Sequence, residues 1–217
     1  STQAKTLFPY TTLFRSGVAH DVQRSRVGMD AQVWSPRQTW VERVLVFDVT
    51  GNTFSREELV AAFEVFEQTV DRAAQSRDWD PWTDHYTEDV LYIEHAAGTM
   101  HGREEVRPWI WNTMESFPGS YMTAFPVLWK VFDEATGRVI CELDNPMRDP
   151  GDGTIIGATN ISIVTYAGDG LWSRQEDVYN PLRFVAATAK WCNKAKELGT
   201  LPDEAAEWMR KFGGWGR

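Results

Sequence analysis

The chain has 217 residues, of which 42% are hydrophobic and 24% charged, and its formal net charge is −9. This composition is typical of one ordinary soluble domain with some surplus residues at an end. The negative charge argues against nucleic acid and against an anionic membrane surface as partners, because both need a clustered basic face. No apolar run approaches the roughly 18 to 20 residues that span a bilayer, and no secretion signal is recognisable. A cytoplasmic protein is therefore expected.

The first 52 residues are predicted to form a disordered extension ahead of a domain at residues 53–197, which a second extension follows at 198–217. Residues 7–16 read LFPYTTLFRS and resemble the translation of a sequencing-adapter primer. This resemblance indicates a reading frame from shotgun or metagenomic assembly, in which the adapter-derived residues have no evolved function. Whether residues 17–50 are native and folded is left open, because their sequence is compatible with a strand or with accidental translation.

The folded domain is predicted to begin with a helix at Ser55. Ser55 can cap this helix while Glu58 reaches back to it, which is the capping-box pattern. Apolar residues then recur at three- and four-residue spacing, as in an amphipathic helix. A second, short helix is predicted from Asp80, which would be its cap, through Pro81 in the first turn and on to Tyr86.

The rest of the chain changes from helix to strand and back. A strand is predicted over residues 90–95 and a third helix over about 102–115. Four β-rich runs follow, separated by Gly-rich and Asp-Gly breaks that predict hairpins and an antiparallel meander. These runs are 121–133, 138–145, 154–167 and 171–179. Helices are predicted at 181–197 and 203–212, which completes an α+β layer architecture.

This order of elements resembles the nuclear-transport-factor-2-like superfamily, and in particular its SnoaL-like members. The motifs that carry the resemblance are Asp78-Trp79, YTEDV at 86–90, GTMHGREEV at 98–106 and EDVYNP at 176–181. The resemblance covers roughly residues 54–195. It implies a cone in which a curved antiparallel sheet packs against three helices around one pocket, with added C-terminal helices. It also implies a homodimer through the exposed sheet face, and it leaves the activity open because this scaffold hosts many functions.

The resemblance to ketosteroid isomerases points to His95 as a general base. Those enzymes have a base at the end of this strand, and counting back from Gly98 gives His95, although the isomerases have a carboxylate there. An imidazole is well suited to move a proton near neutral pH. Because side chains alternate along a strand, Tyr92 and Glu94 are expected on one face and His95 on the other. The alternative is a histidine that only bonds to backbone at a strand end.

A second candidate cluster is acidic and resembles the site of limonene-epoxide-hydrolase-like members. There an arginine and an aspartate two residues apart on one strand orient a water with an aspartate on the last strand and a tyrosine. By position, Asp144, Asp177 and Tyr92 match this pattern. The arginine position is Glu142 and the water-holding asparagine is Glu94, so like charges would face each other and raise one pKa. The alternative for the two aspartates is a solvated rim pair or a salt bridge.

We therefore predict a cofactor-independent acid–base enzyme of the isomerase, cyclase or dehydratase type. Its substrate would be a small apolar carbonyl or polyketide-like compound, because the eleven tryptophans can supply large apolar walls as well as core packing. His95 is the expected base, with Asp144, Asp177 and Tyr92 as the other catalytic residues. The expected substrate-binding residues are Glu94, Glu142, Trp129, Trp82 and Tyr179.

Three alternatives remain beside this prediction. The first is a limonene-epoxide-hydrolase-like epoxide hydrolase, and the second is a non-catalytic module that binds a small molecule or a protein. The third is a metal site made of Glu94, His95, Glu142 and Asp144, which has no local ligand motif in its favour. The isolated cysteines Cys141 and Cys192 argue against a thiolate zinc site, and no metal or cofactor is predicted.

Overall fold

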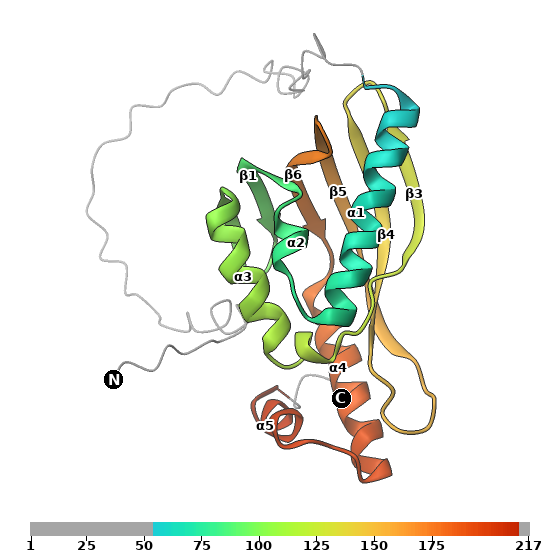
Figure 1. Cartoon of the computed structure of the whole chain (residues 1–217). Helices are drawn as coiled ribbons and strands as arrows, with labels where there is room; N and C mark the ends of the chain where they lie inside the picture. The colour runs from blue at the N-terminus through green and yellow to red at the C-terminus, as the bar shows by residue number, and fades with distance from the viewer. Residues whose placement is uncertain (1–53, 213–217) are drawn as a thin grey trace, which may run out of the picture.

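The structure is a computed structural model that describes residues 54–212 (Figure 1). The predictions for residues 1–52 lie outside the described residues. The helices are α1 (Arg56–Ser76), α2 (Asp80–Thr83), α3 (Arg103–Glu115), α4 (Pro181–Leu198) and α5 (Asp203–Phe212). The strands are β1 (Tyr86–Glu94), β2 (Gly98–His101), β3 (Val127–Asp133), β4 (Arg138–Met147), β5 (Ile156–Gly168) and β6 (Leu171–Val178). Within the described part, no helix combines the length and apolar character needed to cross a membrane.

The six strands form one curved, unclosed sheet in the order β2-β1-β6-β5-β4-β3. Strands β3 to β6 make the predicted antiparallel meander, in which each strand pairs with the next. Strand β1 instead lies beside β6 and runs parallel to it. The sheet is therefore mixed, whereas the prediction was a wholly antiparallel sheet. Parallel neighbours need a long connection, and here α3 and the meander supply it.

Helix α1 begins as predicted and lies across the concave face of the sheet (Figure 1). The Ser55 side chain accepts a hydrogen bond from the backbone N–H of Glu58 at 3.1 Å, which caps the first turn. The apolar stripe of the helix, including Leu59, Phe63 and Phe66, is buried in the main core. Together with α2 and α3, this helix makes the layer that covers the sheet.

The segment between α2 and α3 differs from the prediction. Helix α2 ends at Thr83, and Tyr86 is the first residue of β1 and not the end of a helix. Tyr86 is fully buried, and its hydroxyl donates a hydrogen bond to Gln175 on β6, so tertiary packing assigns it to the sheet. Residues 98–101, which lie between the predicted strand and the predicted third helix, form the edge strand β2. Such a short strand with a glycine carries no readable alternation.

The two C-terminal helices occur where they were predicted, beyond the end of the sheet (Figure 1). Helix α4 is capped by Asn180, whose side chain accepts from the N–H of Leu182 at 3.0 Å. Helix α5 is tied to the domain by Glu204, which accepts a hydrogen bond from the Tyr121 hydroxyl at 2.5 Å. A second core packs between these helices and the domain around Trp191, which is almost fully buried. Thus residues 198–212 continue the folded domain.

Candidate active site

The pairing of the strands arranges the concave face of the sheet in rows. One row runs from β4 to β1 through Cys141, Ser162, Asp177 and Glu94. The row beside it runs through Val139, Val164, Gln175 and Tyr92. Directly paired residues of neighbouring strands share a face. The polar members of both rows therefore gather on β5, β6 and β1, and they form what we call the floor of the site.

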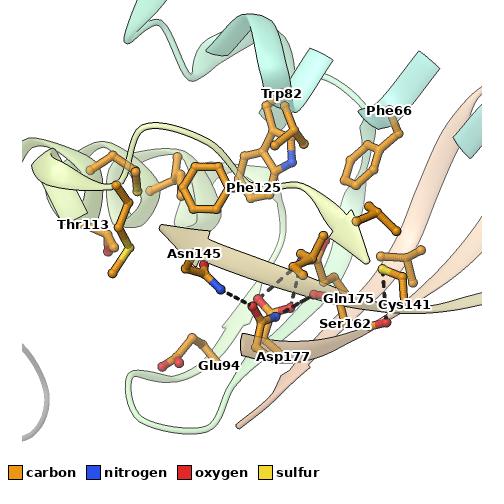
Figure 2. Close-up of a pocket in the computed structure, with 18 of the residues that line it drawn as sticks. Phe66, Trp82, Glu94, Thr113, Phe125, Cys141, Asn145, Ser162, Gln175 and Asp177 are labelled. Carbon is orange, nitrogen blue, oxygen red and sulfur yellow. Dashed lines mark hydrogen bonds between the residues drawn. The ribbon is translucent and has the colours of Figure 1, made fainter. Parts of the chain in front are cut away.

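A cavity of about 250 Å³ lies between this floor and the helices. Its walls are largely aromatic, and Figure 2 shows Phe66 and Trp82 across the cavity from Asp177 and Glu94. Phe125 lies between the two sides. An apolar cavity with a few convergent polar groups is the usual composition of a small-molecule site. The volume is slightly below the roughly 300 to 1,000 Å³ of typical ligand pockets, so the ligand is small.

Asp177 is the centre of the floor and is held by neutral donors (Figure 2). Its Oδ1 accepts hydrogen bonds from Ser162 Oγ at 2.5 Å and from Gln175 Nε2 at 3.0 Å. Its Oδ2 accepts from the Tyr92 hydroxyl at 2.5 Å. Burial raises the pKa of Asp177 above its ordinary value, although the hydrogen bonds from Ser162, Tyr92 and Gln175 act in the opposite direction.

A chain of buried amides extends from Asp177 along the floor. Asn145 Nδ2 donates to Asn160 Oδ1 at 2.8 Å, and Asn160 Nδ2 donates to Ser162 Oγ at 3.0 Å. Every bond in this chain donates in the direction of Asp177, so the chain supports negative charge on that carboxylate. Sequence reasoning missed Asn145, Asn160, Ser162 and Gln175. Their signal was present, because Asn160 and Ser162 alternate with apolar residues inside a β-rich run.

Glu94 is the second carboxyl of the floor, at the register position opposite Asp177. Its Oε2 accepts from the backbone N–H groups of Ala96 and Ala97, and its Oε1 accepts from the Tyr179 hydroxyl. Burial is the largest cause that raises the pKa of Glu94, and the nearby charge of Asp177 raises it further. The site thus holds two carboxyls with raised pKa values in one apolar cavity.

The structure separates the nine predicted site residues into two groups. Five of them line the cavity together: Trp82, Tyr92, Glu94, Asp177 and Tyr179. The other four lie outside the cavity lining: His95, Trp129, Glu142 and Asp144.

His95, the expected base, lies on the convex side of the sheet. Its side chain is 47% exposed, and its Nε2 lies 3.0 Å from Glu176 Oε1. Trp129 and Glu142 also lie on the convex face, where the indole Nε1 donates to Glu142 Oε2 at 2.6 Å. The alternation predicted for β1 explains the position of His95, because Tyr92 and Glu94 take the concave face.

On β4, the residues that match the epoxide-hydrolase pattern are each one position away from the residues that line the cavity. The β4 side chains that line the cavity are Cys141, Leu143 and Asn145, so Glu142 and Asp144 point to the opposite face. Among residues 54–212, no arginine lines the cavity. The proposed metal ligands do not converge either, since Glu94 is separated from the other three by the sheet. In the described part of the chain, no group of three or more His, Cys, Asp or Glu is placed to hold a metal ion.

A curved sheet that encloses an apolar cavity with its covering helices defines the nuclear-transport-factor-2-like class of α+β folds. The sequence model of the SnoaL-like domain matches residues 66–175, from the middle of α1 to β6. The chain therefore belongs to the SnoaL-like domain family. A search of curated proteins found no match.

Solved structures of several such proteins are similar to this chain. An NTF2-like protein from Anabaena variabilis is 13% identical, with a TM-score of 0.45 over 59% of this chain and 94% of its own. A protein described as a SnoaL-like polyketide cyclase, from Jannaschia sp., is 17% identical, with a TM-score of 0.47 over 63% and 96%. An epoxide hydrolase of M. tuberculosis resembling limonene-epoxide hydrolase is 12% identical, with a TM-score of 0.49 over 67% and 95%. At these identities the similarity concerns the fold.

Proposed function

We propose that this protein is a cofactor-independent acid–base enzyme that moves protons on a small, largely apolar carbonyl compound. The reaction would be of the isomerase, cyclase or dehydratase type. The observation that carries the proposal is the pair formed by Asp177 and Glu94, which face one apolar cavity from paired strands. Carboxyls whose pKa values are raised by burial are suited to act as acid and base near neutral pH.

The two carboxyls take different roles in this proposal. We assign the ionised form to Asp177 and the protonated form to Glu94, whose pKa the charge of Asp177 raises. Asp177 then removes a proton from the carbon next to the substrate carbonyl. Glu94 donates a proton to the enolate that results, at oxygen or at a second carbon. Tyr92 holds the Asp177 carboxylate, and Tyr179 holds Glu94.

This proposal transfers the role of base from His95 to Asp177. A base must come within hydrogen-bond reach of the proton that it removes. Asp177 lines the cavity, whereas His95 is on the other side of the sheet and is paired with Glu176. Asp144, which was expected to be an acid or an orienting group, accepts a hydrogen bond from the N–H of Asn145 and lies outside the cavity lining. Neither residue has a catalytic role in the proposal.

The proposal is tested by exchange of carbon-bound protons in deuterated water. The full chain would be incubated with a panel of small cyclic ketones and enones, and exchange next to the carbonyl would be followed by proton NMR. Asp177→Asn keeps the shape of the side chain and removes the base, so we expect exchange to fall about a hundredfold or more. Glu94→Gln removes the acid and should also slow the reaction.

Two convex-face variants are the matched controls. Asp144→Asn makes the same chemical change as Asp177→Asn, and His95→Ala removes the base predicted from sequence. Both should exchange protons at rates within about twofold of wild type. Loss of exchange in His95→Ala with retention in Asp177→Asn would overturn the assignment of the base. Binding of the panel without any exchange would make the protein a binding module, and opening of epoxides by the same cavity would make it a hydrolase.

We also propose that the protein is a homodimer that pairs through the convex face of the sheet. The paired rows on this face contain the half-buried residues Ile93, Ile140 and Ile163. Val131 and Trp129 beside them are 53% and 44% exposed. Val131, Ile140 and Ile163 are directly paired across β3, β4 and β5, and Glu176 separates them from Ile93. Apolar surface on a sheet supports burial against a partner, and a second copy of the same face is the simplest complementary surface. The cytoplasmic location stays a prediction.

A further inference from the structure

The cavity is lined by acidic side chains from both of its sides. Asp177 and Glu94 lie on the floor, and Glu67 and Asp71 line the cavity from α1, which crosses over the floor. Asp71 is exposed, so it lies at an opening of the cavity. Within residues 54–212, the cavity lining contains no lysine, arginine or histidine. A ligand inside it therefore meets carboxyls and no basic side chain.

The basic groups near the site are paired with carboxylates, one of which is Glu67 of the cavity lining. Lys130 forms an ion pair with Glu67, and its ammonium lies 5.2 Å from the ring centre of Phe63. On the convex face, Arg174 and His95 both pair with Glu176, at 2.8 and 3.0 Å. The floor carboxyls are instead held by hydroxyl, amide and backbone N–H donors. These donors carry no formal charge, so the negative charge of the floor is not neutralised by an ion pair within the cavity.

Aromatic rings stand directly beside the charged floor. Tyr92 donates its hydroxyl to Asp177, and its ring lies 4.9 Å from Trp109 and 6.1 Å from Trp82, between ring centres. All three rings line the cavity, and Figure 2 shows Trp82 on the opposite side of the cavity from Asp177. The faces of aromatic rings attract cations and repel anions, most strongly where water is excluded. A ring that turns its face to the ligand therefore favours the same sign of ligand charge as the carboxyls.

We infer that the cavity selects its ligand by charge, and that this ligand is a hydrophobic compound of one or two rings that carries a protonated amine. A carboxylate ligand would be repelled by the charged floor, and among residues 54–212 no basic side chain lines the cavity to compensate. The inference rests on the proposed function only in naming this ligand as the substrate. The charge preference itself is a property of binding and does not require turnover.

The experiment compares three probes of one shape and different charge. They are 2-naphthylmethylamine, 2-naphthylmethanol and 2-naphthoate, which are cationic, neutral and anionic at pH 7. Each would be titrated into the full chain by isothermal calorimetry at low ionic strength. We expect the amine to bind tightest and the carboxylate to bind at least about tenfold more weakly than the amine. Equal or tighter binding of the carboxylate would overturn the inference, as would failure of the amine to bind.

Charge-removing variants connect the preference to the floor. Asp177→Asn removes the charge of the floor, so it should weaken binding of the amine and strengthen binding of the carboxylate. Glu94→Gln replaces a carboxyl that keeps its proton in the proposed function, so its effect should be smaller. Circular dichroism would show whether each variant is folded. Glu64→Gln is the matched control, since Glu64 is exposed on α1 and does not line the cavity. An equal change in Glu64→Gln would show that net charge and not the floor is responsible, and would contradict the inference.

The two proposals fail in different ways. A preference for the amine without proton exchange on any ketone would overturn the enzymatic proposal and leave the charge selection in place. Turnover of a substrate that carries a carboxylate would overturn the charge selection and leave the enzymatic proposal in place.

Discussion

The Asp177 carboxylate accepts hydrogen bonds from side chains on three strands: Tyr92 on β1, Ser162 on β5 and Gln175 on β6. A buried carboxylate without such donors would be strongly disfavoured in its ionised form. Here burial still dominates, so the pKa of Asp177 stays above its ordinary value. The carboxylate is therefore available as a base while remaining readily protonated, which is the balance that proton transfer to and from carbon requires.

Removal of one donor should shift this balance in a known direction. The Ser162 hydroxyl lowers the pKa of Asp177, so Ser162→Ala should raise that pKa further. Because the proposed base acts in its ionised form, the acidic limb of the pH–rate profile for proton exchange should move to higher pH. Ser173→Ala is the control, since Ser173 is on β6, the strand of Asp177, but bonds to the Thr165 carbonyl outside the cavity. An unchanged profile in Ser162→Ala would argue against Asp177 as the base.

Strand β1 is the element that completes the site. Its parallel pairing with β6 places Glu94 opposite Asp177 and Tyr92 opposite Gln175. The alternation of β1 was predicted from sequence and separates Glu94 from His95 correctly. His95 was chosen as the base by counting back from Gly98 to the matching position of the ketosteroid isomerases. The sequence of a single strand does not show which of its faces will be concave, and here the concave face carries Glu94. On β4, Glu142 and Asp144 were chosen by their positional match to the epoxide-hydrolase pattern, whereas Leu143 and Asn145 line the cavity.

The proposed homodimer through the convex face of the sheet can be tested by a substitution in that face. If the protein pairs through this face, wild type should be a dimer at micromolar concentration in size-exclusion chromatography with light scattering. Val131→Glu places a charge in the proposed interface and should give a monomer with an unchanged circular dichroism spectrum. Val65→Glu is the control, because Val65 on α1 is similarly exposed, at 48% against 53% for Val131. A monomeric wild type, or equal dissociation in both variants, would contradict the pairing.

At the scale of the whole molecule, the order of helices and strands along the chain was predictable from sequence. Which strands pair with one another in the sheet was less predictable. Periodic apolar residues and turn signals predicted the first helix, the meander and both C-terminal helices, because each depends on local pattern. The parallel pairing of β1 with β6 and the edge strand β2 depend on contacts distant in sequence. The floor depends on them too, since β5, β6 and β1 each contribute only one or two of its polar residues.

The central claim is that Asp177 and Glu94 are a coupled pair of buried carboxyls, and it can be measured without a substrate. Carbon-13 NMR of the side-chain carboxyls would follow the titration of wild type, with Asp177→Asn and Glu94→Gln for assignment. We predict that both carboxyls titrate at higher pH than ordinary aspartate and glutamate side chains. In Asp177→Asn, Glu94 should titrate at lower pH than in wild type, because the charge that raised its pKa is gone. The account would be contradicted if both carboxyls titrated in the ordinary range of aspartate and glutamate and the pKa of Glu94 were the same in Asp177→Asn as in wild type.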